Sequence, residues 1–206
     1  IAHTTLDQRI QSWTKFRLKD RPRAPFFQQL KALGSRTLQN RTYFSVRGDE
    51  IFQFVVGKFR LYEFLTRDDT YYQNLKALSE GHEVYFLLDT KMLHALLDLL
   101  QALENKGLPT DAIGIRYAYR SPEMNKLLKG GKGSRHKYGE AVDLEIGDLN
   151  GDGTANNVDK QIVIELLDKK IIGNRGGIGR YPKSQIVHFD TRGHRARWDK
   201  QGSFDF

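Results

Sequence analysis

The sequence predicts an α+β domain in which an antiparallel sheet carries helices on one face. Three segments have the length and alternation of strands, at residues 113–119, 140–146 and 185–190. Two longer segments, at 90–106 and 158–169, place apolar residues at helical spacing. Because both kinds of element follow one another along the chain, packing helices against a sheet buries the apolar face of each.

Residues 1–87 show a different pattern of expected elements. A capping box at residues 5–8 opens a predicted amphipathic helix that ends near residue 20. A short second helix is expected at 26–33, before Gly34. Residues 42–65 are rich in strand-forming side chains, with a hairpin turn expected at Arg47-Gly48-Asp49. The 206 residues therefore divide into two expected parts: an accessory region of helices plus a β-hairpin at 1–87, and a larger domain at 88–206.

Residues 70–125 contain three expected helices and a further strand, each indicated by its own sequence pattern. Residues 70–80 read as helix and 84–88 as strand. The helix that opens near Thr90 has a broad leucine face and is closed by Gly107. Ser121 is placed to cap a further helix, with Pro122 at its first position.

The segment with the most chemical information is 134–143, which reads S-R-H-K-Y-G-E-A-V-D. His136 leaves a glycine-rich loop, and Gly139 lets the chain turn into a strand. Alternation places Asp143 on the face opposite Val142 and Leu144. A carboxylate in the middle of an apolar strand is costly unless it is paired, and a metal ion is a suitable partner.

A second segment, V-H-F-D at 187–190, places His188 and Asp190 on one face of a later strand. Two imidazoles and one carboxylate form the protein ligand set of a catalytic zinc that keeps one position open. We therefore expect His136, Asp143 and His188 to bind zinc on one face of the sheet, with helices packed on the opposite face.

The pattern S-x-H-x-x-G-x-A-x-D, with its partner V-H-F-D, resembles the M15-type zinc D-Ala-D-Ala peptidases. Their superfamily also contains the lysostaphin-type endopeptidases and the Hedgehog signalling domain. The resemblance covers about residues 88–198. It implies the same three zinc ligands and a zinc metallopeptidase that hydrolyses bacterial peptidoglycan, as a D-alanine carboxypeptidase or a cross-link endopeptidase.

The stretch Y-R-S-P-E-M-N at 119–125 also resembles this group, in which the Arg before the helix faces the substrate. An arginine at the end of a strand can bind a peptide carboxylate or stabilise a developing oxyanion. The resemblance thus implies a catalytic role for Arg120. The alternative is a structural ion pair.

The general base is where the sequence departs from the family. Many M15-type enzymes carry Glu three residues before the last His ligand, and some relatives carry His two before it; here those positions hold Gln185 and Ile186. Asp190 shares the face of His188 and is the favoured base. Glu145 is the second candidate. The alternative role for Asp190 is that of a hydrogen-bond partner of a ligand His.

Residues 148–159 match a calcium loop that opens D-x-N-x-D-G. Glycine follows the third ligand, where such a loop turns sharply. Asp in the last ligand position resembles the dockerin version, and a helix follows. The expected calcium ligands are Asp148, Asn150, Asp152, Thr154 (through its carbonyl), Asn156 and Asp159. A structural Ca²⁺ is predicted, and an ordinary polar turn is the alternative.

Composition limits the partners. The net charge of +8 and a pI of about 9.6 favour anionic partners. Lys and Arg are scattered and no nucleic-acid motif is present, but charge alone does not decide between nucleic acid and the acidic bacterial cell wall. The family resemblance implies peptidoglycan stem peptides as the partner, and not nucleic acid. The chain has no cysteine and no run long enough for a membrane span. Because it begins with Ile1, we expect a removed leader and a bacterial envelope location, periplasmic or secreted.

Two rival functions remain at this stage. One is a catalytically inactive, metal-stabilised binding module of the same fold, as in the Hedgehog branch. The other is a basic nucleic-acid-binding protein that uses both ions structurally, for which DNA binding would depend steeply on salt.

Overall fold

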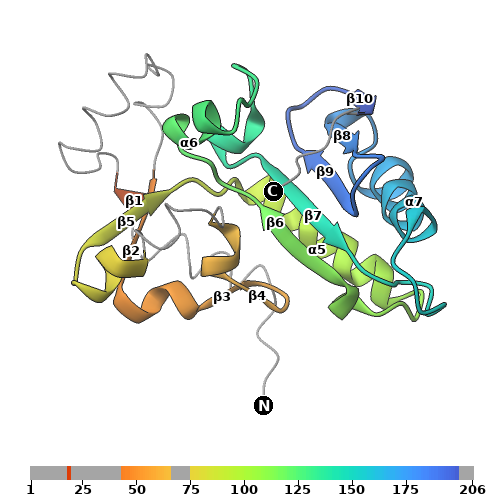
Figure 1. Ribbon diagram of the computed structural model, residues 1–206, viewed down its shortest axis with the longest axis horizontal. Helices are drawn as coiled ribbons and strands as arrows, with labels where there is room; N and C mark the ends of the chain where they lie inside the picture. The colour runs from red at the N-terminus through yellow and green to blue at the C-terminus, as the bar shows by residue number, and fades with distance from the viewer. Residues whose placement is uncertain (1–17, 20–42, 66–74, 200–206) are drawn as a thin grey trace.

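The structure is a computed structural model that describes residues 18–19, 43–65 and 75–199 (Figure 1). The helix predicted at 26–33 lies outside these residues, as does the helix predicted to end near residue 20 except at Leu18–Lys19, which form strand β1 instead of its last turn. None of the described helices is long and apolar enough to cross a membrane.

A five-stranded sheet forms the centre of the molecule. Its strands, in spatial order, are β10 (Ala196–Asp199), β8 (Gly177–Arg180), β9 (Ile186–Asp190), β7 (Ala141–Ile146) and β6 (Ile113–Tyr117). All neighbours pair antiparallel except β10, which runs parallel to β8. The predicted α+β class is confirmed, with one parallel pair at the edge of an otherwise antiparallel sheet.

Helices cover one face of this sheet. The predicted leucine-rich helix is α5 (Thr90–Glu104), which starts where the Asp89 carboxylate accepts the Lys91 N–H at 2.9 Å. The second long helix is α7 (Asn157–Leu166), which continues into a π-turn at Leu167–Ile171. Figure 1 shows α5 running along β6 and β7 while α7 lies beside β9. Both helices contribute to one buried apolar core with the strands.

Alternation along β7 separates the two faces of the sheet. Val142, Leu144 and Ile146 are buried in the apolar core under the helices. Asp143 and Glu145 therefore point to the other face. The shorter helix α6 (Pro122–Leu127) begins at Ser121, whose hydroxyl accepts the Met124 N–H at 3.1 Å as the sequence predicts.

The predicted hairpin at residues 47–49 is wrong. Strand β2 (Tyr43–Arg47) runs instead into a 3₁₀ helix (Gly48–Phe52), because the Glu50 carboxylate accepts the Arg47 N–H at 2.9 Å and caps the turn. β2 pairs antiparallel with β1 (Leu18–Lys19) and β5 (Glu83–Phe86) in a separate three-stranded sheet.

A hairpin does occur a few residues later. β3 (Phe54–Val56) pairs with β4 (Phe59–Arg60) across a turn at Gly57. That turn packs closely on α5, since a Cβ built on Gly57 would lie 2.8 Å from Leu100 Cδ1. A second 3₁₀ helix (Leu61–Phe64) then leads to a parallel bridge between Leu65 and Tyr119. The described residues on both sides of the expected boundary at 87/88 thus share one hydrophobic core.

Candidate metal centre

Three elements bring the predicted metal ligands together. Asp143 on β7 and His188 on β9 are directly opposite each other in the strand register. His136 comes from a 3₁₀ turn (Arg135–Tyr138) just before β7. That turn ends at Gly139 with φ +67°, and a Cβ there would lie 2.3 Å from the Leu87 carbonyl oxygen, so the position needs glycine.

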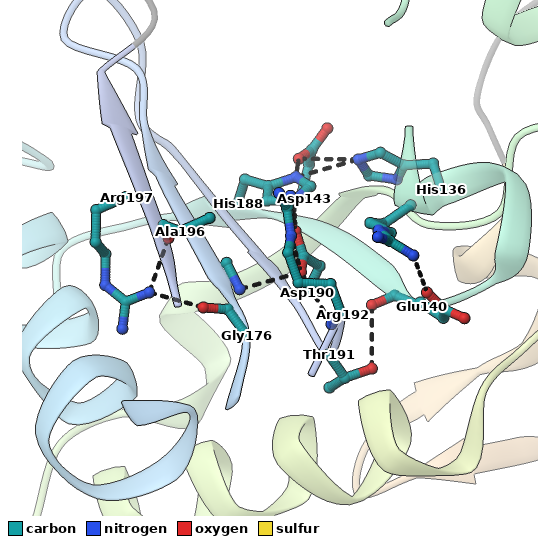
Figure 2. A network of polar contacts seen from close by, with 12 residues as sticks. His136, Glu140, Asp143, Gly176, His188, Asp190, Thr191, Arg192, Ala196 and Arg197 are labelled. Atoms are coloured by element: carbon teal, nitrogen blue, oxygen red, sulfur yellow. Dashed lines mark hydrogen bonds and ion pairs between the residues drawn. The ribbon is translucent and has the colours of Figure 1, made fainter. Parts of the chain in front are cut away.

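The three side chains meet in a small buried group (Figure 2). His188 Nδ1 lies 2.7 Å from Asp143 Oδ1, and His136 Nε2 lies 3.3 Å from the same oxygen. The two imidazole nitrogens are 3.2 Å apart. Among the described residues, no other group of three or more His, Asp or Glu side chains has its possible ligand atoms all within 4.8 Å of one another.

The outer nitrogen of each imidazole is fixed by a hydrogen bond. His136 Nδ1 lies 2.7 Å from the Ala118 carbonyl oxygen, which can only accept, so Nδ1 carries the proton and Nε2 keeps its lone pair. His188 Nε2 lies 3.1 Å from Asp190 Oδ2, which leaves Nδ1 facing the group. His136 Nε2 therefore points a lone pair at Asp143, and His188 Nδ1 faces the same oxygen, so a metal ion would bind both nitrogens after displacing the proton from His188 Nδ1.

Burial and charge act in opposite directions on these groups. Burial lowers the pKa of His136. For His188, burial is outweighed by hydrogen bonds to Asp143 and Asp190, which raise its pKa. Burial likewise disfavours ionised Asp143, yet the two imidazoles hold its pKa well below the usual range. The carboxylate is thus kept in the ionised form in which it can bind a cation.

The donor set fits zinc. Ligand atoms at about 2.0 Å from a tetrahedral ion are about 3.3 Å from one another. The separations of 3.2 and 3.3 Å that involve His136 Nε2 match that value, and the separation of 2.7 Å between His188 Nδ1 and Asp143 Oδ1 is that of a hydrogen bond. Two neutral nitrogens and one carboxylate leave one tetrahedral position for water or substrate.

Arg120 lies beside the group. Its Nη2 donates to Asp143 Oδ2 at 2.7 Å, and its guanidinium lies over the Tyr117 ring, 4.8 Å from the centroid. Its buried Nε has no hydrogen-bond partner among the described residues. Arg120 therefore makes the ion pair that the sequence offered as an alternative, and it retains a donor for a further group.

Asp190 is fully buried, and its carboxylate is occupied by several donors. It accepts the Gly177 N–H at 3.0 Å and the Arg192 Nε–H at 2.8 Å, besides its contacts with Arg192 Nη2 and His188. These donors outweigh burial and lower its pKa. The placement is that of a hydrogen-bond partner of a ligand His, the alternative role considered for Asp190. Glu145, the other candidate base, is exposed on the same face.

Three neighbours of the group were not anticipated from the sequence. Arg192 continues the alternation of His188 and Asp190, and this spacing could have placed it on the same face as them. Trp198 belongs to the unpredicted strand β10, and its ring centroid is 5.1 Å from that of His188. Burial and the charge of Asp143 raise the pKa of Tyr181, one residue past the end of β8.

The predicted calcium loop forms a polar turn before α7. Both oxygens of Asp148 accept backbone N–H bonds, from Gly151, Asp152 and Gly153 at 2.7–3.2 Å. Asp159 is buried, and its carboxylate accepts the Leu149, Asn150 and Asn156 N–H groups. The remaining predicted ligands lie in the exposed part of the loop or at its junction with α7. The loop's carboxylates do not form a group as compact as that around Asp143.

Comparison with known proteins gives one family. The model of the family Peptidase_M15_2, described as peptidoglycan L,D-endopeptidase MepK, matches residues 86–198, which is more than half of the chain. No curated protein is similar enough to the chain to count as a match. The family match includes the metal group and its surroundings, and it confirms the resemblance to M15-type peptidases. The chain therefore belongs to the M15 peptidase family that is represented by the peptidoglycan L,D-endopeptidase MepK.

Proposed function

We propose that this protein is a zinc-dependent peptidase that cuts peptide bonds in bacterial peptidoglycan, and that it acts as an endopeptidase at a bond between an L- and a D-configured centre. The observation that carries the proposal is the meeting of His136, Asp143 and His188, with one nitrogen of each imidazole facing the carboxylate. The endopeptidase specificity rests on the description of the family.

The proposed zinc ligands are His136, Asp143 and His188. When bound there, zinc would polarise the scissile carbonyl and lower the pKa of a water molecule toward about 7. Asp190 holds the proton on His188 Nε2 and so keeps Nδ1 available to the ion. Arg120, whose guanidinium lies beside Asp143 and is partly exposed, binds a substrate carboxylate or the oxyanion that forms at the scissile carbonyl.

Glu145 is the base that we propose in place of Asp190. It follows Asp143 by two residues on the same strand face and is exposed, whereas the oxygens of Asp190 are taken by Arg192, Gly177 and His188. A general base needs a free lone pair within reach of the water it deprotonates. Among these two carboxylates, Glu145 meets that requirement better.

The charge of the chain supports the substrate and the place of action. A net charge of +8 favours association with an acidic polymer, and peptidoglycan stem peptides carry carboxylates. We therefore propose a bacterial envelope location, periplasmic or secreted, with residues 88–206 as the peptidase domain.

The test is digestion of purified sacculi with zinc-loaded protein, followed by mass analysis of the products. We expect split cross-linked muropeptides, suppression of their release by a chelator, and casein left intact. Arg120→Ala should weaken this activity while zinc content stays the same. Cleavage of casein with untouched sacculi would refute the proposed substrate.

One observation favours a second candidate, an inactive binding module. Gln185 stands where many M15-type enzymes carry their base, and its Nε2 donates to the Ala155 carbonyl oxygen at 2.9 Å instead of facing the metal group. Such a module would bind zinc fully and retain sacculi without cutting them. The digestion experiment separates the two functions.

We also propose that loop 148–159 binds a structural Ca²⁺ through Asp148, Asn150, Asp152, Thr154, Asn156 and Asp159. The support is the ligand pattern in the sequence and the exposure of the first half of the loop. The turn is also closed by its own hydrogen bonds, so only a binding measurement separates an ion site from a plain turn.

A further inference from the structure

We propose that Trp198 is a positioning residue for the metal ligand His188, and that Gly179 is present so that the indole can reach that ligand. The inference rests on the proposed zinc site, and it adds a residue and a strand that lie outside the predicted ligand set. It also explains why the unpredicted edge strand β10 belongs to the site.

The strand register places these residues in one row across the sheet. Trp198 on β10 is opposite Gly179 on β8, Gly179 is opposite His188 on β9, and His188 is opposite Asp143 on β7. Residues that are opposite one another in neighbouring strands point to the same face. Because the residue between Trp198 and His188 has no side chain, the indole can lie across it and contact the imidazole.

Gly179 has a steric reason to be glycine. A Cβ built at this position would lie 2.6 Å from both Cε2 and Nε1 of Trp198, closer than real Cβ atoms approach other atoms. Its φ is not positive, so the backbone conformation itself does not require glycine. The close approach of the indole is what excludes a side chain.

Trp198 also holds the partner of Asp190. The Arg192 guanidinium lies over the indole, 5.1 Å from its centroid, and donates to the Asp190 carboxylate that contacts His188 Nε2. Gly177, two residues before Gly179, makes room in the same way, because its Cβ would lie 2.4 Å from Asp190 Oδ2. Each glycine of β8 thus lets one neighbour of His188 approach the backbone closely, Trp198 at Gly179 and Asp190 at Gly177.

The imidazole of His188 is therefore fixed on several sides. His136 meets it edge-on with ring centroids 5.0 Å apart, and the tilted Trp198 ring meets it at 5.1 Å. Asp143 and Asp190 contact its two nitrogens. Removing the indole would free both the ring and the Arg192–Asp190 pair, so the lone pair of Nδ1 would be less well aimed. Loss of an outer support of this kind typically weakens metal binding about 10–100-fold.

The test uses the full chain with Trp13 replaced by Phe, which leaves Trp198 as its single tryptophan. Co²⁺, whose visible absorption reports ligand geometry, is titrated while indole fluorescence is followed, and zinc affinity is measured by competition. We expect Co²⁺ to quench the fluorescence of Trp198 at one equivalent. In the original background, Trp198→Ala and Gly179→Ala should each weaken zinc binding about 10–100-fold and alter the cobalt spectrum.

Conservative and control variants make the result specific. Trp198→Phe keeps a ring against His188 and should recover most of the affinity. Gly131→Ala, where a Cβ meets nothing within 4 Å, and Phe52→Ala, whose side chain is exposed, should match the wild type. Thermal melting identifies variants that fail to fold, and Gly179→Ala then carries the test if Trp198→Ala does not fold.

The outcomes separate this inference from the proposed function. Wild-type zinc affinity and cobalt spectra in folded Gly179→Ala and Trp198→Ala variants would overturn the positioning role while leaving the zinc site intact. Absence of zinc binding in the wild type itself would overturn both.

Discussion

At the scale of single residues, the site depends on how each ligand is held as much as on which ligands are present. Ala118 fixes the tautomer of His136 and Asp190 fixes that of His188. The cost of burying Asp143 is offset by both imidazoles and by Arg120. Removal of one member leaves the others as unpaired buried polar groups, so substitutions here act on metal affinity first.

His136→Ala should abolish tight zinc binding. The variant loses one of two nitrogen ligands and leaves the Asp143 carboxylate with a single imidazole. Elemental analysis of protein purified metal-free and then reconstituted should show one zinc per wild-type chain and almost none in the variant. His82→Ala, at an exposed His outside the group, is the control. Wild-type zinc content in His136→Ala would rule out this ligand set.

Asp190→Asn and Glu145→Gln should have different effects. Asp190→Asn is expected to weaken zinc binding about 10–100-fold, because its amide is a poorer acceptor for His188 Nε2–H. Glu145→Gln should keep zinc and lower kcat about 10²–10⁴-fold through loss of proton transfer. Zinc affinity and sacculus turnover are measured for both, with Glu165→Gln on α7 as control. Full zinc affinity with lost turnover in Asp190→Asn would return the base role to Asp190.

At the scale of elements, β10 and the π-turn after α7 are joined by one carboxylate. Asp168 accepts from Arg195 Nη1 at 2.7 Å and from Arg197 Nε at 2.9 Å. Arg197 also donates to the carbonyls of Gly173 and Gly176. This cluster anchors the strand that carries Trp198, so it links the packing of an edge strand to the metal group.

Asp168 should contribute to stability above its ordinary pKa and lose that contribution in acid. Hydrogen bonds from Arg195 and Arg197 lower its pKa in the folded chain. The contribution is therefore complete above the unfolded pKa of about 3.9 and disappears as the pH falls through the lower folded value. Between about pH 5 and about pH 2, Asp168→Asn should show a smaller fall in Tm than wild type. Asp111→Asn, at a 95% exposed carboxylate, should show the same fall in Tm with pH as wild type. If Tm of Asp168→Asn falls with pH as steeply as that of wild type, Asp168 does not contribute to stability in this way.

Calcium should raise the Tm of the zinc-loaded protein if loop 148–159 is an ion site. Binding to the folded state alone adds about 2.7 kcal/mol at one hundred times Kd. Asp152→Ala should remove the rise because Asp152 is an exposed ligand in the middle of the pattern, whereas Asp111→Ala should retain it. A wild-type Tm that is the same with calcium and with a calcium-selective chelator would identify the loop as a plain turn.

At the scale of the whole molecule, the five-stranded sheet and the described residues before 88 share one hydrophobic core. The 3₁₀ helix Leu61–Phe64 packs against β6, and β3 packs against α5. Phe59 and Phe64, which are fully buried, meet edge-on with centroids 6.4 Å apart. Described residues before 88 thus pack against α5 and β6 of the part matched by the peptidase family.

The fragment 88–206 should not unfold as one cooperative unit, because removal of the preceding residues exposes apolar surface on α5 and β6. Calorimetry of the fragment and of the full chain provides the comparison. In the full chain, Phe64→Ala should cost about 3–5 kcal/mol, whereas the half-exposed Phe52→Ala should cost less than about 1 kcal/mol. A fragment as stable as the full chain would establish residues 88–206 as an independent domain.

The sequence by itself determined the elements whose signals are local. The leucine periodicity of α5, the Ser121-Pro122 helix start and the alternation along β7 and β9 each depend on neighbours a few residues apart. The same alternation placed Asp143 and His188 on one face, and the motif spacing joined them to His136. The turn at Arg47-Gly48-Asp49 was misread because the Glu50 cap competes with a hairpin turn.

Only the tertiary structure decided what surrounds those ligands. β8 reads Gly-Ile-Gly-Arg and β10 reads Ala-Arg-Trp-Asp, and neither has the apolar alternation from which a strand is predicted. β8 pairs with the edge of β9, β10 pairs in turn with β8, and the two glycines of β8 let Trp198 and the Asp190–Arg192 pair lie against the sheet. The role of Asp190 depends on the same contacts. Its face was readable from the sequence, whereas the Gly177 N–H that occupies one of its oxygens comes from another strand, and the Arg192 guanidinium that donates to it lies over the indole of Trp198 on β10.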